Sequence, residues 1–159
     1  MAHINELTKD GPYGGPGGSA YDARSNESRV HRVRTWSADY AGYNVLGGIQ
    51  FDFDDGSSSG RIGGRDPNIN YYEDKPFIFD DGEKIEDMTV FAGDGEGFCN
   101  GIMFHTNKAE KGPWKGGSQI GYPFHVPDLG NGEWAGATGR DSQHGANAVV
   151  DNMVLYFRK

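Results

Sequence analysis

The groups of this chain best placed to do chemistry are the backbone amides of its glycine-rich turns and one carboxylate near the C-terminus. Glycine-rich turns recur at intervals of roughly 50 residues, at residues 11–18, 60–64 and 112–117. Glycine lets the main chain take positive φ and lets another group approach its N–H donors closely. Asp151 lies near the start of the β-prone run of residues 149–158, on a face it shares with Val149 and Met153. A buried, unpaired carboxylate is costly, so Asp151 either caps loop amides or meets a polar ligand.

The remaining acids do not indicate an enzyme. Asp54–Asp55 and Asp80–Asp81 each precede a glycine in a hairpin-turn pattern, where aspartate serves the turn itself. A pair of carboxylates flanking a glycosidic bond is therefore not supported. We expect a non-catalytic protein.

Metal and cofactor sites are not predicted either. The histidines at 105, 125 and 144 lack the spacing of a zinc site, and no cysteine cluster joins them. The closely spaced acids Asp52, Asp54 and Asp55 are candidates for a calcium site, but the alternation of a strand accounts for Asp52 and Asp54. The loop after them lacks the length and the terminal glutamate of a dedicated calcium loop.

Composition and charge narrow the class of partner. The formal net charge of -8 disfavours nucleic acids and anionic membranes and suits a neutral polar ligand. The single cysteine, Cys99, has no partner for an intramolecular disulfide and is interpreted as a small buried hydrophobe. The chain shows no signal-peptide apolar region and no run near 18 apolar residues. We therefore expect no membrane insertion, and a protein that is cytoplasmic or released without a signal peptide.

The elements that position these groups read as strands. A chain of 159 residues with 26 glycines and 8 tyrosines predicts one all-β domain, placed at residues 11–159 after an N-terminal extension, residues 1–10. Residues 48–54 alternate apolar with polar, and residues 98–106 direct Ile102 and Phe104 inward. Residues 122–127 indicate an edge strand because they contain two prolines, and residues 130–145 are expected to be mostly loop. The glycine period predicts pseudo-three-fold symmetry.

Four segments together resemble the jacalin-related lectins: residues 11–22, 101–107, 112–117 and 151–157. The resemblance covers residues from about 10 to 159. It implies a β-prism I fold, in which three Greek-key sheets surround a pseudo-three-fold axis. It also implies a lectin whose partners are glycans or glycoproteins.

In that family the sugar lies between the first glycine turn (residues 11–18) and the loop that leads into the last strand. Carried over, the resemblance implies that Asp151 accepts hydrogen bonds from sugar hydroxyls, and that main-chain donors come from Gly14 or Gly15, or else from Gly17 or Gly18. The family's Gly-x-x-x-Asp motif is altered here, because Asn147 stands four residues before the aspartate. The preceding loop, residues 139–147, is longer than usual, and it either adds hydroxyl contacts or covers the pocket. Its polar candidates are Asp141, Gln143, His144 and Asn147.

Three aromatic residues near glycines, Tyr13, Trp114 and Trp134, are candidates for stacking on a sugar ring. Galactose-type members use a free N-terminal glycine made by cleavage, whereas here ten residues precede Gly11, so mannose or glucose specificity is favoured. The alternatives are a galactose- or GalNAc-binding lectin, or a β-prism scaffold that has lost sugar binding.

One shallow sugar site binds weakly, at ~mM, so avidity predicts a homo-oligomer or further sites on the other glycine turns. By pseudo-symmetry such sites would lie near Gly63, Gly64 and Asp66, or near Gly116 and Gly117.

Overall fold

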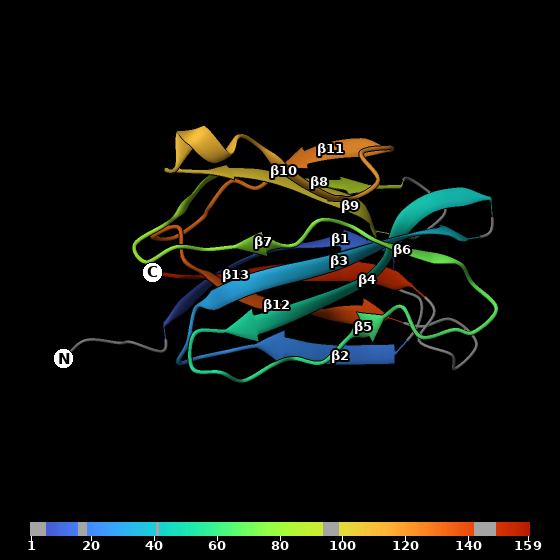
Figure 1. Ribbon diagram of the computed structural model, residues 1–159, viewed down its shortest axis with the longest axis horizontal. Helices are drawn as coiled ribbons and strands as arrows, with labels where there is room; N and C mark the ends of the chain where they lie inside the picture. The colour runs from blue at the N-terminus through green and yellow to red at the C-terminus, as the bar shows by residue number, and fades with distance from the viewer. Residues whose placement is uncertain (1–5, 16–18, 41, 94–98, 142–148) are drawn as a thin grey trace.

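The computed structural model describes residues 6–15, 19–40, 42–93, 99–141 and 149–159. These ranges hold thirteen β-strands and one short 3₁₀ helix, η1 (Ala109–Lys111), so the prediction of an all-β protein is confirmed (Figure 1). No helix within them is long and apolar enough to cross a bilayer. The strands form three antiparallel sheets, and the sheet of β8 to β11 makes the upper layer in Figure 1.

Each sheet is built on a central hairpin with an outer strand on either side. The first sheet has the order β1 (Leu7–Gly14), β13 (Val150–Arg158), β12 (Trp134–Asp141) and β2 (Ser19–Arg24). The second has the order β5 (Ile62–Gly63), β4 (Tyr43–Phe53), β3 (Val30–Tyr40) and β6 (Tyr71–Glu73), with β7 (Phe77–Ile78) also paired to β3. The third has the order β10 (Trp114–Gly117), β9 (Cys99–Thr106), β8 (Ile85–Ala92) and β11 (Tyr122–His125).

The glycine period of the sequence corresponds to one repeated feature of these sheets. In each sheet one outer strand pairs with the second strand of the central hairpin, and the last residue of that outer strand is a glycine with positive φ. These glycines are Gly14 (φ 111°), Gly63 (φ 65°) and Gly117 (φ 70°), and they pair with Asn152, Gly48 and Gly101 respectively. The predicted pseudo-three-fold arrangement is confirmed by this matching register.

The core lies where the inner faces of the three sheets meet. The second hairpin strand of each sheet sends alternate side chains into it, as period-2 patterning requires, and the buried residues are Ile49, Phe51, Ile102, Phe104, Met153 and Leu155. Trp134 joins the sheets through edge contacts, with ring centroids 5.0 Å from Phe51 and 6.0 Å from Phe104. This shared core fixes where each hairpin ends.

The expectation of a mostly loop segment at residues 130–145 was wrong, because strand β12 occupies residues 134–141. Its glycines mark close approach of neighbouring backbones. A Cβ on Gly136 would lie 2.2 Å from the carbonyl oxygen of Ala23, and one on Gly139 would lie 2.3 Å from that of Asn152. Glycine in these positions serves the sheet rather than a turn.

Candidate functional site

The first glycine turn and the loop between β12 and β13 leave the first sheet at the same end. Gly14, the last residue of β1, pairs with Asn152 near the start of β13. Asp141, the last residue of β12, pairs with both Val150 and Ser19. The opposite end of the sheet holds the paired residues Leu7 and Arg158 and the C-terminus (Figure 1).

The structure therefore brings together the backbones of four of the residues predicted from the sequence. Gly14 is exposed, Gly15 is buried directly after it, and Asp141 and Asp151 lie on the neighbouring strands. Gly17, Gly18, Gln143, His144 and Asn147 lie outside the described residues, as do the side chains of Asp141 and Asp151. The roles proposed for these side chains stay predictions.

Asp151 occupies a β-bulge. Arg140 pairs with Asn152 and Asp141 pairs with Val150, so the register steps over Asp151, which is the extra residue of its strand. Bulges bend a strand, take one residue out of the ladder and are frequent beside binding sites. The uninterrupted alternation expected from the sequence does not hold at this position.

The side chain of Asn152 connects the first glycine turn to strand β12. Its side chain is 8% exposed, its Nδ2 donates to the carbonyl oxygen of Gly15 at 2.5 Å, and its Oδ1 accepts from the backbone N–H of Arg140 at 3.0 Å. The hydroxyl of Tyr21 donates to the Asn152 carbonyl at 2.9 Å. Asn152 thus holds the first glycine turn against β12, next to the bulge at Asp151.

Sequence reasoning missed Asn152, although a signal was present. An asparagine inside an otherwise apolar strand has to find hydrogen-bond partners if it is buried. Its place beside the glycine turn would have identified it as a structural tie.

The other two sheets lack a carboxylate at the position of Asp151. If the core residues Met153, Ile102 and Ile49 are aligned, Asp151 corresponds to Asn100 in β9 and to Gly47 in β4. These sheets therefore do not repeat the acceptor of the first.

Polar groups expected to bind sugar at the other glycine turns already have partners: one main-chain donor, one main-chain acceptor and one carboxylate. The N–H of Gly117 donates to Asp74 at 2.9 Å, and a guanidinium nitrogen of Arg61 donates to the carbonyl of Gly64 at 3.2 Å. Asp66 accepts from the backbone of Asn68 at 2.9 Å within its own turn. These contacts favour the first sheet as the principal site.

The two tryptophans predicted to stack on a ligand are core residues, so that expectation was wrong. Both are buried, with Trp114 donating to the carbonyl of Lys75 at 2.6 Å and Trp134 donating to that of Gly136 at 3.1 Å. Their apolar area stabilises the junction of the sheets instead.

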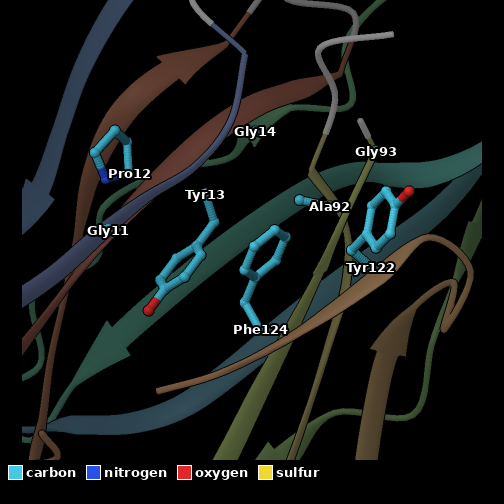
Figure 2. Close-up of a pocket in the computed structure, with 8 residues that line it drawn as sticks. All are labelled: Gly11, Pro12, Tyr13, Gly14, Ala92, Gly93, Tyr122 and Phe124. Atoms are coloured by element: carbon cyan, nitrogen blue, oxygen red, sulfur yellow. The ribbon is translucent and has the colours of Figure 1, made fainter. Parts of the chain in front are cut away.

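Tyr13, the third aromatic candidate, is half-buried and lies beside a pocket. This pocket, with a volume of about 610 Å³, adjoins the first glycine turn (Figure 2). It is lined by Gly11, Pro12, Tyr13, Gly14, Ala92, Gly93, Tyr122 and Phe124.

The acids considered for calcium are held by arginines. Asp52 accepts from Arg32 at 2.8 Å, and Asp54 accepts from Arg29 at 3.0 Å. Burial raises the pKa of Asp52, but hydrogen bonds from Gln50 and Arg32 outweigh it and hold that pKa below its usual value. Within the described ranges, no three histidine, cysteine or acidic residues gather as a metal site.

A family model, the Jacalin-like lectin domain, matches residues 10–148. The chain belongs to this family. Its members are carbohydrate-binding proteins and not enzymes, as the absence of a catalytic constellation in the sequence predicted. The resemblance stated from the sequence motifs is thereby confirmed.

Similarity to individual relatives is low in sequence and high in fold. A mannose/glucose-specific lectin from Parkia pendula is 24% identical over an alignment of 181 residues, covering 92% of this chain and 38% of that protein. The lectin domain thus spans well under half of that relative.

Two solved structures show the shared fold. The crystal structure of lamprey immune protein matches with a TM-score of 0.76 at 20% identity, over 100% of this chain and 46% of that one. AcmJRL, a mannose-binding jacalin-related lectin from Ananas comosus, matches with a TM-score of 0.69 at 22% identity, over 96% and 99%. The predicted β-prism fold is confirmed.

Proposed function

We propose that this domain is a lectin of mannose/glucose type that binds the hydroxyls of a sugar between the first glycine turn and the segment of residues 141–151. Main-chain N–H groups of the turn donate to the hydroxyls, and the Asp151 carboxylate accepts from them. The observation that carries the proposal is the register at the start of β13, which sets the bulged Asp151 next to the Asn152 tie to Gly15.

Charge and family support the same ligand class. A net charge of -8 suits a neutral, hydroxyl-rich ligand better than an anionic one. The mannose preference rests on two of the relatives named above, the mannose/glucose-specific lectin from Parkia pendula and the mannose-binding AcmJRL. Binding proceeds without a metal ion, because main-chain amides and one carboxylate supply the hydrogen bonds.

A single site of this kind binds a monosaccharide at ~mM, about -4 kcal/mol. Useful avidity then requires several copies of the site, so homo-oligomerisation is part of the proposal. A cytoplasmic location, or release without a signal peptide, also stays a prediction.

The test is calorimetric titration with methyl α-mannoside, methyl α-glucoside and methyl α-galactoside, alongside a glycan array. We expect binding of the first two, retained after treatment with a chelator. Asp151→Asn should abolish it while thermal unfolding stays within about 1 °C of the parent. Asp81→Asn, an exposed turn aspartate at the other end of the domain, is the matched control and should bind normally. Full binding by Asp151→Asn would overturn the proposed site.

A further inference from the structure

The pocket beside the first glycine turn has the construction of a ligand site in its own right. We call it the aromatic groove, formed by residues 11–14, Ala92, Gly93, Tyr122 and Phe124. It lies between the outer strand β1 of the first sheet and the outer strand β11 of the third (Figure 2). Its volume of about 610 Å³ falls within the range of ligand pockets, roughly 300–1,000 Å³.

Three aromatic rings form its wall. Tyr122 and Phe124 alternate along β11 and so project from the same face of that strand. They are 55% and 43% exposed, although large apolar side chains normally gain free energy by burial. The Phe124 ring lies 5.8 Å from that of Tyr13, tilted by 46°, and the two rings stand next to one another in Figure 2.

The position of Tyr13 is set by a glycine that no other residue replaces without strain. The pairing of β1 with β13 shifts register between Asp10 and Tyr13, so β1 carries an extra residue there. Gly11 has φ 118°, and a Cβ on it would lie 2.8 Å from the carbonyl oxygen of Met153. The bulge therefore depends on Gly11, and it sets the position of Tyr13 beside the groove.

The polar groups of the groove are uncharged. Burial, and then the nearby Asp10 carboxylate, raise the pKa of the Tyr13 phenol, so its hydroxyl stays protonated. None of the eight lining residues has a side chain that is ionised at neutral pH. Aromatic faces, phenol hydroxyls and glycine backbone suit the alternating C–H and O–H surface of a neutral sugar ring.

We propose that the aromatic groove holds a second sugar ring of the glycan whose terminal sugar binds at the first glycine turn. The inference rests on the function proposed above. Gly14 belongs to both places, and the next residue, Gly15, is one Cα–Cα step of about 3.8 Å away. The groove therefore adjoins the proposed sugar site, within reach of the next sugar ring of a bound glycan.

A second copy of the chain is a poorer occupant. Both strands bordering the groove carry a proline, Pro12 in β1 and Pro123 in β11. Proline has no N–H, so neither border presents an unbroken row of donors for pairing with another strand.

The experiment compares methyl α-mannoside with α-linked mannobioses by calorimetry. We expect the parent domain to bind at least one mannobiose about tenfold more tightly than the monosaccharide. The double variant Tyr122→Ala/Phe124→Ala should lose this tenfold advantage and keep the monosaccharide affinity. Tyr72→Ala is the control, because Tyr72 is a tyrosine of similar exposure, 59%, in the second sheet. It should leave both affinities unchanged.

Each other outcome points to a different error. A parent that binds the monosaccharide but gains nothing from a second sugar leaves the lectin proposal standing and overturns the groove. The same holds if the double variant retains the tenfold advantage, or if it changes only self-association in sedimentation. A parent that binds no saccharide overturns both.

Discussion

The hydrogen bonds of Asn152 allow the stability of the site to be predicted quantitatively. Asn152→Ala removes two of them and leaves the carbonyl of Gly15 and the N–H of Arg140 without this partner. Leaving a buried polar group without its hydrogen bond costs about 1–3 kcal/mol, which applies to the carbonyl of the buried Gly15, whereas losing the part-buried bond to the Arg140 N–H costs about 1 kcal/mol, so the two together cost about 2–4 kcal/mol. We take about 3 kcal/mol as the working value, which is a large part of the 5–15 kcal/mol typical of a whole domain.

The matched control is Asn100→Ala. Asn100 is 2% exposed, and replacing it with alanine removes the same side-chain atoms as Asn152→Ala does. Its side chain, however, makes only one described hydrogen bond, from Nδ2 to the carbonyl of Ile120 at 2.8 Å. Its Oδ1 is buried and accepts no hydrogen bond within the described part of the chain. Asn100→Ala should therefore cost about 1 kcal/mol less than Asn152→Ala.

Differential scanning calorimetry measures the difference directly. For a chain of this size about 1 kcal/mol lowers Tm by about 2–4 °C, so Asn152→Ala should lower it by about 6–12 °C. Asn100→Ala should then unfold about 2–4 °C above Asn152→Ala. If Asn100→Ala proves equally or more damaging, the assignment of Asn152 as the tie between turn and strand is refuted.

Three further outcomes are expected. Gly101→Ala should destabilise the fold by about 3 kcal/mol, because the new Cβ would overlap the carbonyl oxygen of Ser118. Gly82→Ala is the control: no atom lies within 4 Å of its Cβ, so only the positive φ costs free energy, about 1–2 kcal/mol. Urea titrations measure both. Lys111→Met should cost about 3 kcal/mol at pH 7, since it removes the 2.6 Å ion pair of the buried Glu83. Burial raises the pKa of Glu83, but hydrogen bonds from Lys111 and its other partners outweigh burial and lower that pKa. The ion pair therefore stabilises the fold at pH values above the ordinary glutamate pKa of about 4.3, and the cost of Lys111→Met should shrink as the pH falls below that value. A cost of Lys111→Met that does not change with pH would contradict this reasoning. Cys99 should resist thiol reagents at pH 8 until the domain unfolds, because burial raises its pKa to about 12, and labelling of the native protein would show the burial to be wrong.

The sequence allowed the strands and their three-fold repetition to be predicted, because both follow from local patterns. Alternation placed Ile102 and Phe104 inward, where they are found. The glycines at the ends of the outer strands mark positions of positive φ that few other residues adopt, and their spacing repeats with the sheets.

The features that could not be predicted from the sequence depend on contacts between segments that pair only in the fold. The glycines of β12 were interpreted as loop signals because nothing local shows that Ala23 and Asn152 approach them. Trp134 was expected to face a ligand, but an aromatic beside glycine is equally suited to a crowded core. The bond from Asn152 to Gly15 likewise joins residues 137 positions apart, and the bulge at Asp151 follows from how β13 pairs with β12, which no local pattern shows.

The pairing of Leu7 with Arg158 has a practical consequence for handling this protein. Strand β13, with nine residues, runs from the glycine turn to the far end of the domain, a distance of about 26 Å for the eight steps between its residues at about 3.3 Å each. A tag or tether joined after Lys159 emerges at that far end. Molecules immobilised through it on a sensor chip or bead present the turn, the bulge and the aromatic groove outward, toward the glycans in solution.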